Sequence, residues 1–322
     1  MSAKTKVGLF MDNCEHGQGL SLVEQYFTDV ALPLLEKDFS EYMPYLAAGL
    51  VGPGSECWGF DDAFSRDHDW GPQFCLWVSS SISKEALSAL HAWYKNLPVD
   101  FDGMPSSNMQ APDLFRYGVI KVADFFYVHA GLSEKPDSWQ TWNKKELVLS
   151  MMTNGKVFFD NAGEFTAWRK HLQGFYPEEL RLKKLAARCF ISGQSGQYNL
   201  PRLVKRKDIH GIRWAEFTFA STICSLYHLL QKAYCPYPKW ELASVARLDA
   251  TGLVLAKKIQ ELLTAPEQYK VQLAEDIAQF VEKALLSHFP LISYNGALMP
   301  FSEQLNKLIR DASLAQAPLY CF

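Results

Sequence analysis

The fold of this chain is decided by residues 46–78, which read LAAGLVGPGSECWGFDDAFSRDHDWGPQFCLWV. Two short apolar runs, 46–51 and 74–78, enclose a polar segment that contains several glycines. Apolar runs of this length, bounded by turn-forming residues, are typical of buried β-strands. The stretch therefore predicts two core strands joined by a connection that carries polar side chains.

Two features of this connection indicate phosphate chemistry. Gly54 and Ser55 form a predicted turn after the first strand, where backbone N–H groups and a hydroxyl can bind a closely approaching phosphate. Asp67 and Asp69 follow; on an extended chain they project to one side while His68 points to the other. Two adjacent carboxylates need a compensating cation, and their oxygens suit Mg²⁺. Although either feature alone is common in surface loops and helix caps, together they predict metal-assisted phosphoryl or nucleotidyl transfer.

This connection resembles the nucleotide-binding motif of the polymerase-β-like nucleotidyltransferase superfamily, in which Gly-Gly or Gly-Ser precedes Asp-x-Asp or Asp-x-Glu. More narrowly, residues 54–72 resemble a bacterial family of uncharacterised-domain proteins, distantly similar to kanamycin nucleotidyltransferase, that shares the run GSE…GFDD…SRDHDWGP. The likeness extends over residues 19–245, where 234–240 (YCPYPKW) is similar to that family's Y-x-P-Y-x-K-W segment. His68 departs from the superfamily pattern, which usually has a hydrophobic residue there, so its role stays open.

The resemblance implies a Mg²⁺-dependent enzyme that transfers a nucleoside monophosphate from a nucleoside triphosphate, with ATP as the expected donor. The implied acceptor is a hydroxyl of a small molecule or of a protein, and the sequence does not choose between them. The competing interpretation is a nucleotide-binding or scaffold protein that kept the fold without turnover.

A two-metal mechanism usually needs a third carboxylate on a strand next to the first pair. Asp100 is the favoured candidate, since it follows a predicted helix in a Val-Asp-Phe context that reads as a strand. Asp102 and Asp124 are the alternatives, and each of the three can also be an ordinary turn or cap residue. The predicted catalytic and metal-binding set is therefore Asp67, Asp69 and Asp100.

Three further residues complete the predicted nucleotide site of Gly54 and Ser55. Arg66 either holds a phosphate or pairs with an aspartate of the GFDD run. Tyr237 is a candidate for stacking on the base or sugar, and Lys239 for binding the triphosphate as a point charge. The alternative for Lys239 is a surface lysine whose stem covers the following tryptophan.

The remaining pattern predicts an α+β protein of two domains. Residues 1–135 are expected to form a small mixed-sheet nucleotidyltransferase domain, with a helix over 20–38 broken near Pro33 and another over 83–97 capped by Ser83. Apolar residues then recur at helical spacing, which predicts an α-helical bundle over residues 136–322. Residues 214–233 are apolar almost all round and predict a central helix of that bundle.

Composition sets the expected surroundings of this protein. A net charge of −3 lacks a strongly basic footprint, which disfavours nucleic acid as a partner. Seven cysteines without a C-x-x-C pair are typical of reduced thiols in a cytoplasm. Since no apolar run approaches the roughly 18 residues of a membrane span, we expect a cytoplasmic protein without membrane association.

Overall fold

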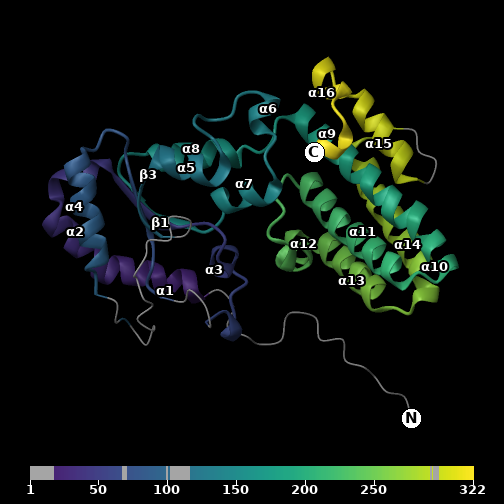
Figure 1. Cartoon of the computed structure of the whole chain (residues 1–322), viewed down its shortest axis with the longest axis horizontal. Coiled ribbons are helices and arrows are strands. Elements are labelled where there is room, and N and C mark those ends of the chain that lie inside the picture. The colour runs from purple at the N-terminus through teal and green to yellow at the C-terminus, as the bar shows by residue number, and fades with distance from the viewer. Residues whose placement is uncertain (1–17, 67–70, 99–100, 102–116, 291, 293–296) are drawn as a thin grey trace, which may run out of the picture. The chain divides into compact units, whose positions relative to one another are not determined.

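The computed structural model describes residues 18–66, 71–98, 101, 117–290, 292 and 297–322. The chain divides into two compact units, one of residues 1–135 and 148–174 and one of residues 136–147 and 175–322 (Figure 1). The first segment of the first unit ends at residue 135, which is also where the sequence predicted the boundary between the two domains. Residues 148–174, which the sequence assigned to the helical domain, return to the first unit instead.

The first unit combines helices with a four-stranded sheet, so the α+β class is confirmed. Its strands run in the order β3-β2-β1-β4; β1 is antiparallel to β2 and to β4, and β2 is parallel to β3. The sheet is therefore mixed, as predicted. The elements are α1 (Gln18–Tyr26), a π-helical turn (Phe27–Ala31), α2 (Leu32–Asp38), β1 (Leu46–Leu50), α3 (Ser55–Trp58), β2 (Cys75–Val78), α4 (Lys84–Lys95), β3 (Gly118–Lys121), α5 (Val122–Ala130), most of α7 (Glu146–Thr153), β4 (Lys156–Asp160) and α8 (Glu164–Gln173).

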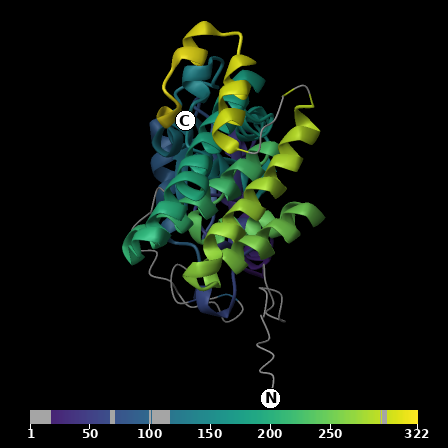
Figure 2. The same ribbon diagram turned by 90° about the vertical axis from the view of Figure 1, so that its right-hand side faces the viewer.

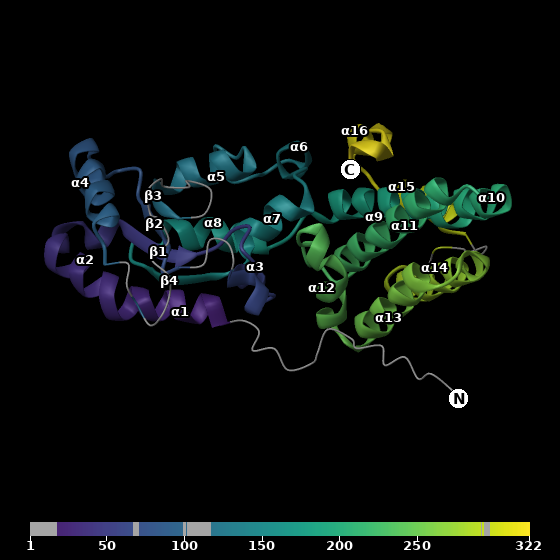
Figure 3. The same ribbon diagram turned by 60° about the horizontal axis from the view of Figure 1, so that its bottom comes forward.

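Both faces of the sheet are covered, which explains why its central strands are apolar throughout. Leu76 and Val78 of β2 lie in the core formed with α1, α2 and α4, whereas Trp77 points to the opposite face because side chains alternate along a strand. There Trp77 stacks on Phe165 of α8, with ring centroids 3.6 Å apart. Figure 3 shows α5 on one side of the strands and α1 on the other.

The predicted helices of this unit are confirmed in position. The first is interrupted by the π-helical turn directly before Pro33, since proline cannot donate to the preceding turn. Helix α4 begins after Ser83, whose hydroxyl accepts a hydrogen bond from Ala86 N at 3.1 Å. Strands β1 and β2 lie within the two predicted apolar runs.

Strand β4 was missed by the sequence prediction, which assigned all of residues 136–322 to an α-helical bundle. Asn154 and Gly155 form the turn that precedes this strand, and Gly155 has a φ of 58°. An Asn-Gly pair followed by Val-Phe-Phe is a recognisable strand signal. The predicted strand around Asp100 lies outside the described residues except for Phe101.

The second unit is built of helices alone within its described residues, and Figure 2 looks onto it. Helix α9 packs against α11 and α15, and α14 packs against α11 and α13. This agrees with the predicted helical bundle. Its helices are α6 (Trp139–Trp142), α9 (Glu178–Ser192), α10 (Leu200–Arg206), α11 (Ile209–Leu230), α12 (Glu241–Leu248), α13 (Ala250–Thr264), α14 (Glu267–His288), α15 (Leu298–Lys307) and α16 (Ala312–Gln316), with a π-helical segment at Gly193–Asn199.

Helix α11 is central only in its second half. Its residues from Phe219 onward are mostly buried, as predicted. Trp214 and Phe217, however, are 55% and 60% exposed, because this side of the first turns faces solvent. None of the helices in the described ranges is both long and apolar enough to cross a bilayer.

Candidate functional sites

The predicted Gly54–Ser55 turn is held in the sheet-containing unit by a segment distant in sequence. Asn154 Nδ2 donates to Gly52 O at 2.7 Å, and Gly52 N donates to Asn154 Oδ1 at 2.9 Å. Gly155 N donates to Cys57 O at 2.8 Å. The turn is thus fixed by main-chain and amide hydrogen bonds from both sides, with Gly54 at the N-cap of α3.

Ser55 has donor groups that no residue in the described part of the chain uses. Its carbonyl accepts from Phe60 N at 3.0 Å, which closes the short helix α3. Its hydroxyl and its amide N–H make no hydrogen bond with any described residue. Ser55 is half-buried, so part of its surface is open to a ligand. Such a turn can receive an anionic oxygen.

The aspartates of the GFDD run have structural tasks in this connection. Asp61 is 2% exposed, and its Oδ2 accepts from Gly19 N at 2.9 Å, which ties the start of α1 to the connection. Asp62 Oδ1 accepts from Phe64 N and Ser65 N, both at 3.0 Å. Both carboxylates therefore accept main-chain hydrogen bonds that stabilise this connection.

The predicted carboxylate ligands lie outside the described residues. This holds for Asp67, Asp69, Asp100 and the alternative Asp102, and the side chain of Arg66 is likewise not described. Asp124 is described: it sits in the first turn of α5, where it is exposed. Among the described ranges no three His, Cys, Asp or Glu side chains are grouped to hold a metal ion.

Tyr237 and Lys239 belong to the helical unit. Tyr237 is 48% exposed, and Lys239 lies in the short 3₁₀-helix Pro238–Trp240. The Lys239 ammonium sits 4.8 Å from the centroid of the Trp240 ring. This is the geometry of the alternative interpretation, in which the lysine covers its neighbouring tryptophan. A role of Lys239 in phosphate binding stays a prediction.

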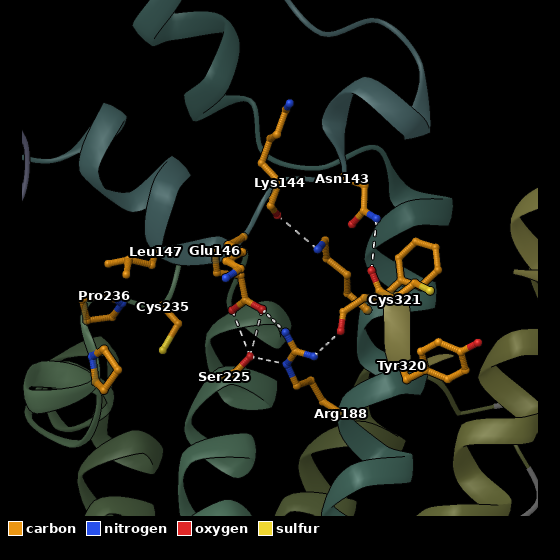
Figure 4. A pocket seen from close by; sticks show the side chains of 14 residues that line it. Asn143, Lys144, Glu146, Leu147, Arg188, Ser225, Cys235, Pro236, Tyr320 and Cys321 are labelled. Carbon is orange, nitrogen blue, oxygen red and sulfur yellow. Dashed lines mark hydrogen bonds and ion pairs between the residues drawn. The ribbon is translucent and has the colours of Figure 1, made fainter. Parts of the chain in front are cut away.

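A second candidate site, which no sequence motif indicated, is a pocket of about 430 Å³ within the helical unit. Residues 143–147, helices α9 and α11, the loop 235–238 and residues 320–322 line it (Figure 4). Sequence reasoning missed it because its residues come from segments far apart in the chain. Only the one-turn spacing of Lys184 and Arg188 on a predicted helix could have marked a shared face.

A buried ion pair forms one wall of this pocket. Arg188 Nη2 lies 2.9 Å from Glu146 Oε1, and Arg188 Nε donates to Ser225 Oγ at 2.6 Å. The Ser225 hydroxyl is also 2.9 and 3.0 Å from the two carboxylate oxygens of Glu146. Arg188 Nη1 donates to Phe322 O at 2.8 Å, so the guanidinium and the carboxylate are both well satisfied (Figure 4).

Lys184 lines the same pocket and is only 2% exposed. Its ammonium donates to Lys144 O at 3.3 Å and lies 4.8 Å from the Tyr176 ring centroid. Burial lowers the pKa of Lys184 to about 8, although the Glu146 carboxylate acts in the opposite direction. A cation with such a pKa is stabilised by any anion that enters beside it.

Two other buried titratable groups of this unit are satisfied internally. His228 is held by Cys224 O and Ser244 Oγ, each at 2.8 Å, and burial lowers its pKa. Glu241 accepts from Ser221 Oγ at 2.9 Å, and burial raises its pKa. In both groups burial disfavours the charged form, which is typical of structural residues in a core.

Comparison with known proteins gives one match. A family described as a domain of unknown function (DUF4037) matches residues 139–241. No curated protein and no solved structure matches the chain. The matched region contains the Glu146–Arg188–Ser225 network, Lys184 and Lys239, whereas the Gly54–Ser55 turn lies outside it.

Proposed function

We propose that this protein is a Mg²⁺-dependent nucleotidyltransferase whose donor site lies in the connection between β1 and β2. In this proposal the Ser55 amide and hydroxyl bind a phosphate oxygen, and Asp67 and Asp69 hold the metal. Asp100 is the proposed third carboxylate. Arg66 of the same connection is a further proposed contact to the nucleotide.

One observation carries the proposal. Strands β1 and β2 are antiparallel neighbours, and Gly49 near the end of β1 pairs with Cys75 at the start of β2. The connection 51–74 therefore leaves and re-enters the sheet at one end. The Ser55 turn with its unused donors and the Asp67–Asp69 pair both belong to that connection. A phosphate-binding turn and a carboxylate pair in one such connection are the parts that metal-assisted nucleotidyl transfer needs.

In this proposal, different residues of the chain support the turn and anchor the connection. Asn154 and Gly155 keep the turn in shape, so that the Ser55 donors are oriented before the nucleotide arrives. Asp61 ties the connection to the start of α1, and Asp62 stabilises the turn that follows it. When bound, Mg²⁺ would supply charge neutralisation on the phosphates.

The reaction is tested with ATP labelled at either the α- or the γ-phosphate. A nucleotidyltransferase releases pyrophosphate and leaves the α-phosphate on its acceptor. We therefore expect an acceptor in a cell extract to be labelled only from α-labelled ATP, and only when Mg²⁺ is present. Label on a protein band identifies a protein acceptor, and label in small solutes identifies a metabolite-like one.

Two outcomes would contradict this proposal. Transfer of the γ-label would indicate kinase or ATPase chemistry. Mg²⁺-dependent binding of ATP without transfer to any component of the extract would favour the non-catalytic nucleotide-binding protein.

A further inference from the structure

Among the described residues of the helical unit, four cationic side chains are almost fully buried. They differ in the groups that compensate their charge. Lys270 pairs with Glu216 and donates to Leu262 O at 2.8 Å. Arg181 pairs with Glu178 and donates to Leu229 O at 3.1 Å. Each of these two cations thus has a carboxylate and a carbonyl. This is the arrangement that a buried charge normally requires.

Lys183 and Lys184 are neighbours on α9 and differ in their hydrogen bonds. Lys183 is 1% exposed and donates to Asn306 Oδ1 at 2.8 Å and to Ala315 O at 2.9 Å. Lys184 is equally buried, but the only hydrogen bond of its ammonium within the described residues is the long one to Lys144 O. That carbonyl is shared, since Tyr176 Oη donates to it at 2.9 Å. No carboxylate in the described part of the chain lies within ion-pair distance of Lys184.

The surroundings of Lys184 are positively charged. The residues that line the pocket include four cations, Lys144, Lys145, Lys184 and Arg188, and a single acid, Glu146. Glu146 is already engaged by Arg188 and Ser225. An entering anion would therefore meet an ammonium whose hydrogen-bonding capacity is largely unused, and the low-dielectric walls would strengthen that contact.

The other residues that line the pocket indicate what kind of molecule would carry the anionic group. Leu147, Pro236, Pro238 and Phe322 contribute apolar surface. A volume of about 430 Å³ lies within the range of small-molecule sites, which is roughly 300–1,000 Å³. The pocket thus suits an organic molecule with a small apolar body and one anionic group.

We propose that this pocket binds a small organic anion and that Lys184 holds its carboxylate or phosphate group. The inference stands independently of nucleotidyl transfer, because it rests on the helical unit alone. It predicts that the charge of Lys184 lowers the stability of the ligand-free protein, since no described residue forms an ion pair with it until the ligand enters.

The test uses the full chain and four aromatic probes of similar size: benzoate, phenyl phosphate, benzyl alcohol and benzylamine. Binding is measured by titration calorimetry at constant ionic strength. We expect saturable binding of at least one anion and much weaker binding of the alcohol and the amine. Benzoate alone would identify a carboxylate site, and phenyl phosphate alone a phosphate site. Equal binding of all four probes would overturn the proposal, because the pocket would then select only by shape.

Two matched variants separate ligand binding from structure. Lys184→Met keeps the length of the stem and removes the charge, so we expect anion binding to weaken by about tenfold or more. Its melting temperature without ligand should stay the same or rise. Lys183→Met should do the reverse, lowering the melting temperature and leaving anion affinity within about twofold. Destabilisation by Lys184→Met with unchanged anion affinity would show that Lys184 only ties α9 to residue 144, and would overturn the proposal.

Discussion

The Ser55 turn of the sheet-containing unit and the ion-pair network of the helical unit differ in how far their polar groups are hydrogen-bonded within the protein. In the sheet-containing unit, the Ser55 hydroxyl and amide make no hydrogen bond within the described residues. In the helical unit, Glu146, Arg188 and Ser225 satisfy one another almost completely. Unused polar groups are available to a ligand, whereas mutually satisfied buried groups mainly hold the fold together.

This difference also distinguishes residues within one pocket. Arg188 and Lys184 lie one turn apart on α9 and both line the cavity. Arg188 is held by Glu146, Ser225 and Phe322. The Lys184 ammonium, in contrast, makes a single long hydrogen bond within the described residues. Substitutions at residues of the first kind should change stability, and substitutions at residues of the second kind should change binding.

The largest expected effect concerns the proposed metal pair. Asp67→Asn or Asp69→Asn removes a charge while keeping the shape, so transfer of α-label should fall by about a hundredfold or more with little change in melting temperature. Asp100→Asn should be similarly inactive. Asp124→Asn is the matched control, because Asp124 is exposed in α5. If the Asp124 variant is the inactive one and Asp100→Asn is active, the third carboxylate is misassigned.

The next largest effect tests the satisfied network of the helical unit. Arg188→Met leaves the Glu146 carboxylate buried without its cation, which should cost about 3–5 kcal/mol of unfolding free energy. Replacing Glu146 by Leu in the same chain should recover part of that loss, since no unpaired charge remains. Chemical denaturation of the three proteins measures both changes. A loss below about 1 kcal/mol for Arg188→Met would argue against a strongly coupled network.

A smaller effect is expected at the support of the Ser55 turn. Asn154→Ala removes two hydrogen bonds to Gly52 and should lower stability by about 1–2 kcal/mol. Nucleotide affinity should fall as well, because the turn is less well oriented. Asn161 provides the control, since its exposed side chain makes one bond to Met43 O and Asn161→Ala should change little. Equal effects of both substitutions would show that the turn does not depend on Asn154.

The smallest expected effect is a pH dependence in the helical unit. Burial, with a contribution from Glu275, raises the pKa of Glu282 to about 7, while Lys283 acts to lower it. The folded state therefore favours the protonated acid, and stability should decline as pH rises from about 4.5 through 7. Glu282→Gln should raise the melting temperature at pH 8 and change it little at pH 4.5. An equal shift at both pH values would contradict this assignment.

Much of the fold could be predicted because its signals are local. The apolar runs of β1 and β2, the Ser83 cap of α4 and the proline that follows the π-helical turn each act on neighbouring residues. Strand β4 was missed although an Asn-Gly turn precedes it, because the helical periodicity on either side dominated the interpretation. Its return to the sheet depends on pairing with β1, a contact between distant segments.

The two candidate sites differ in the same way, because one consists of neighbouring residues and the other of segments far apart in the chain. The Asp-x-Asp metal pair stays a prediction, whereas the Gly54–Ser55 turn could be predicted from the sequence because its residues are neighbours in the chain. The pocket around Lys184 could not, since its walls come from residues 143–147, α9, α11 and the segments at 235–238 and 320–322.

The sequence by itself determined the α+β class, the strands β1 and β2, and the Gly54–Ser55 turn between them. These follow from periodicity, turn residues and side-chain chemistry, which act over a few residues. Only the tertiary structure decided that residues 148–174 complete the sheet-containing unit, that Asn154 braces the turn, and that Lys184 is buried without an ion pair to any described residue. Such facts depend on which distant segments meet, because burial and compensation of charge are properties of the packed chain.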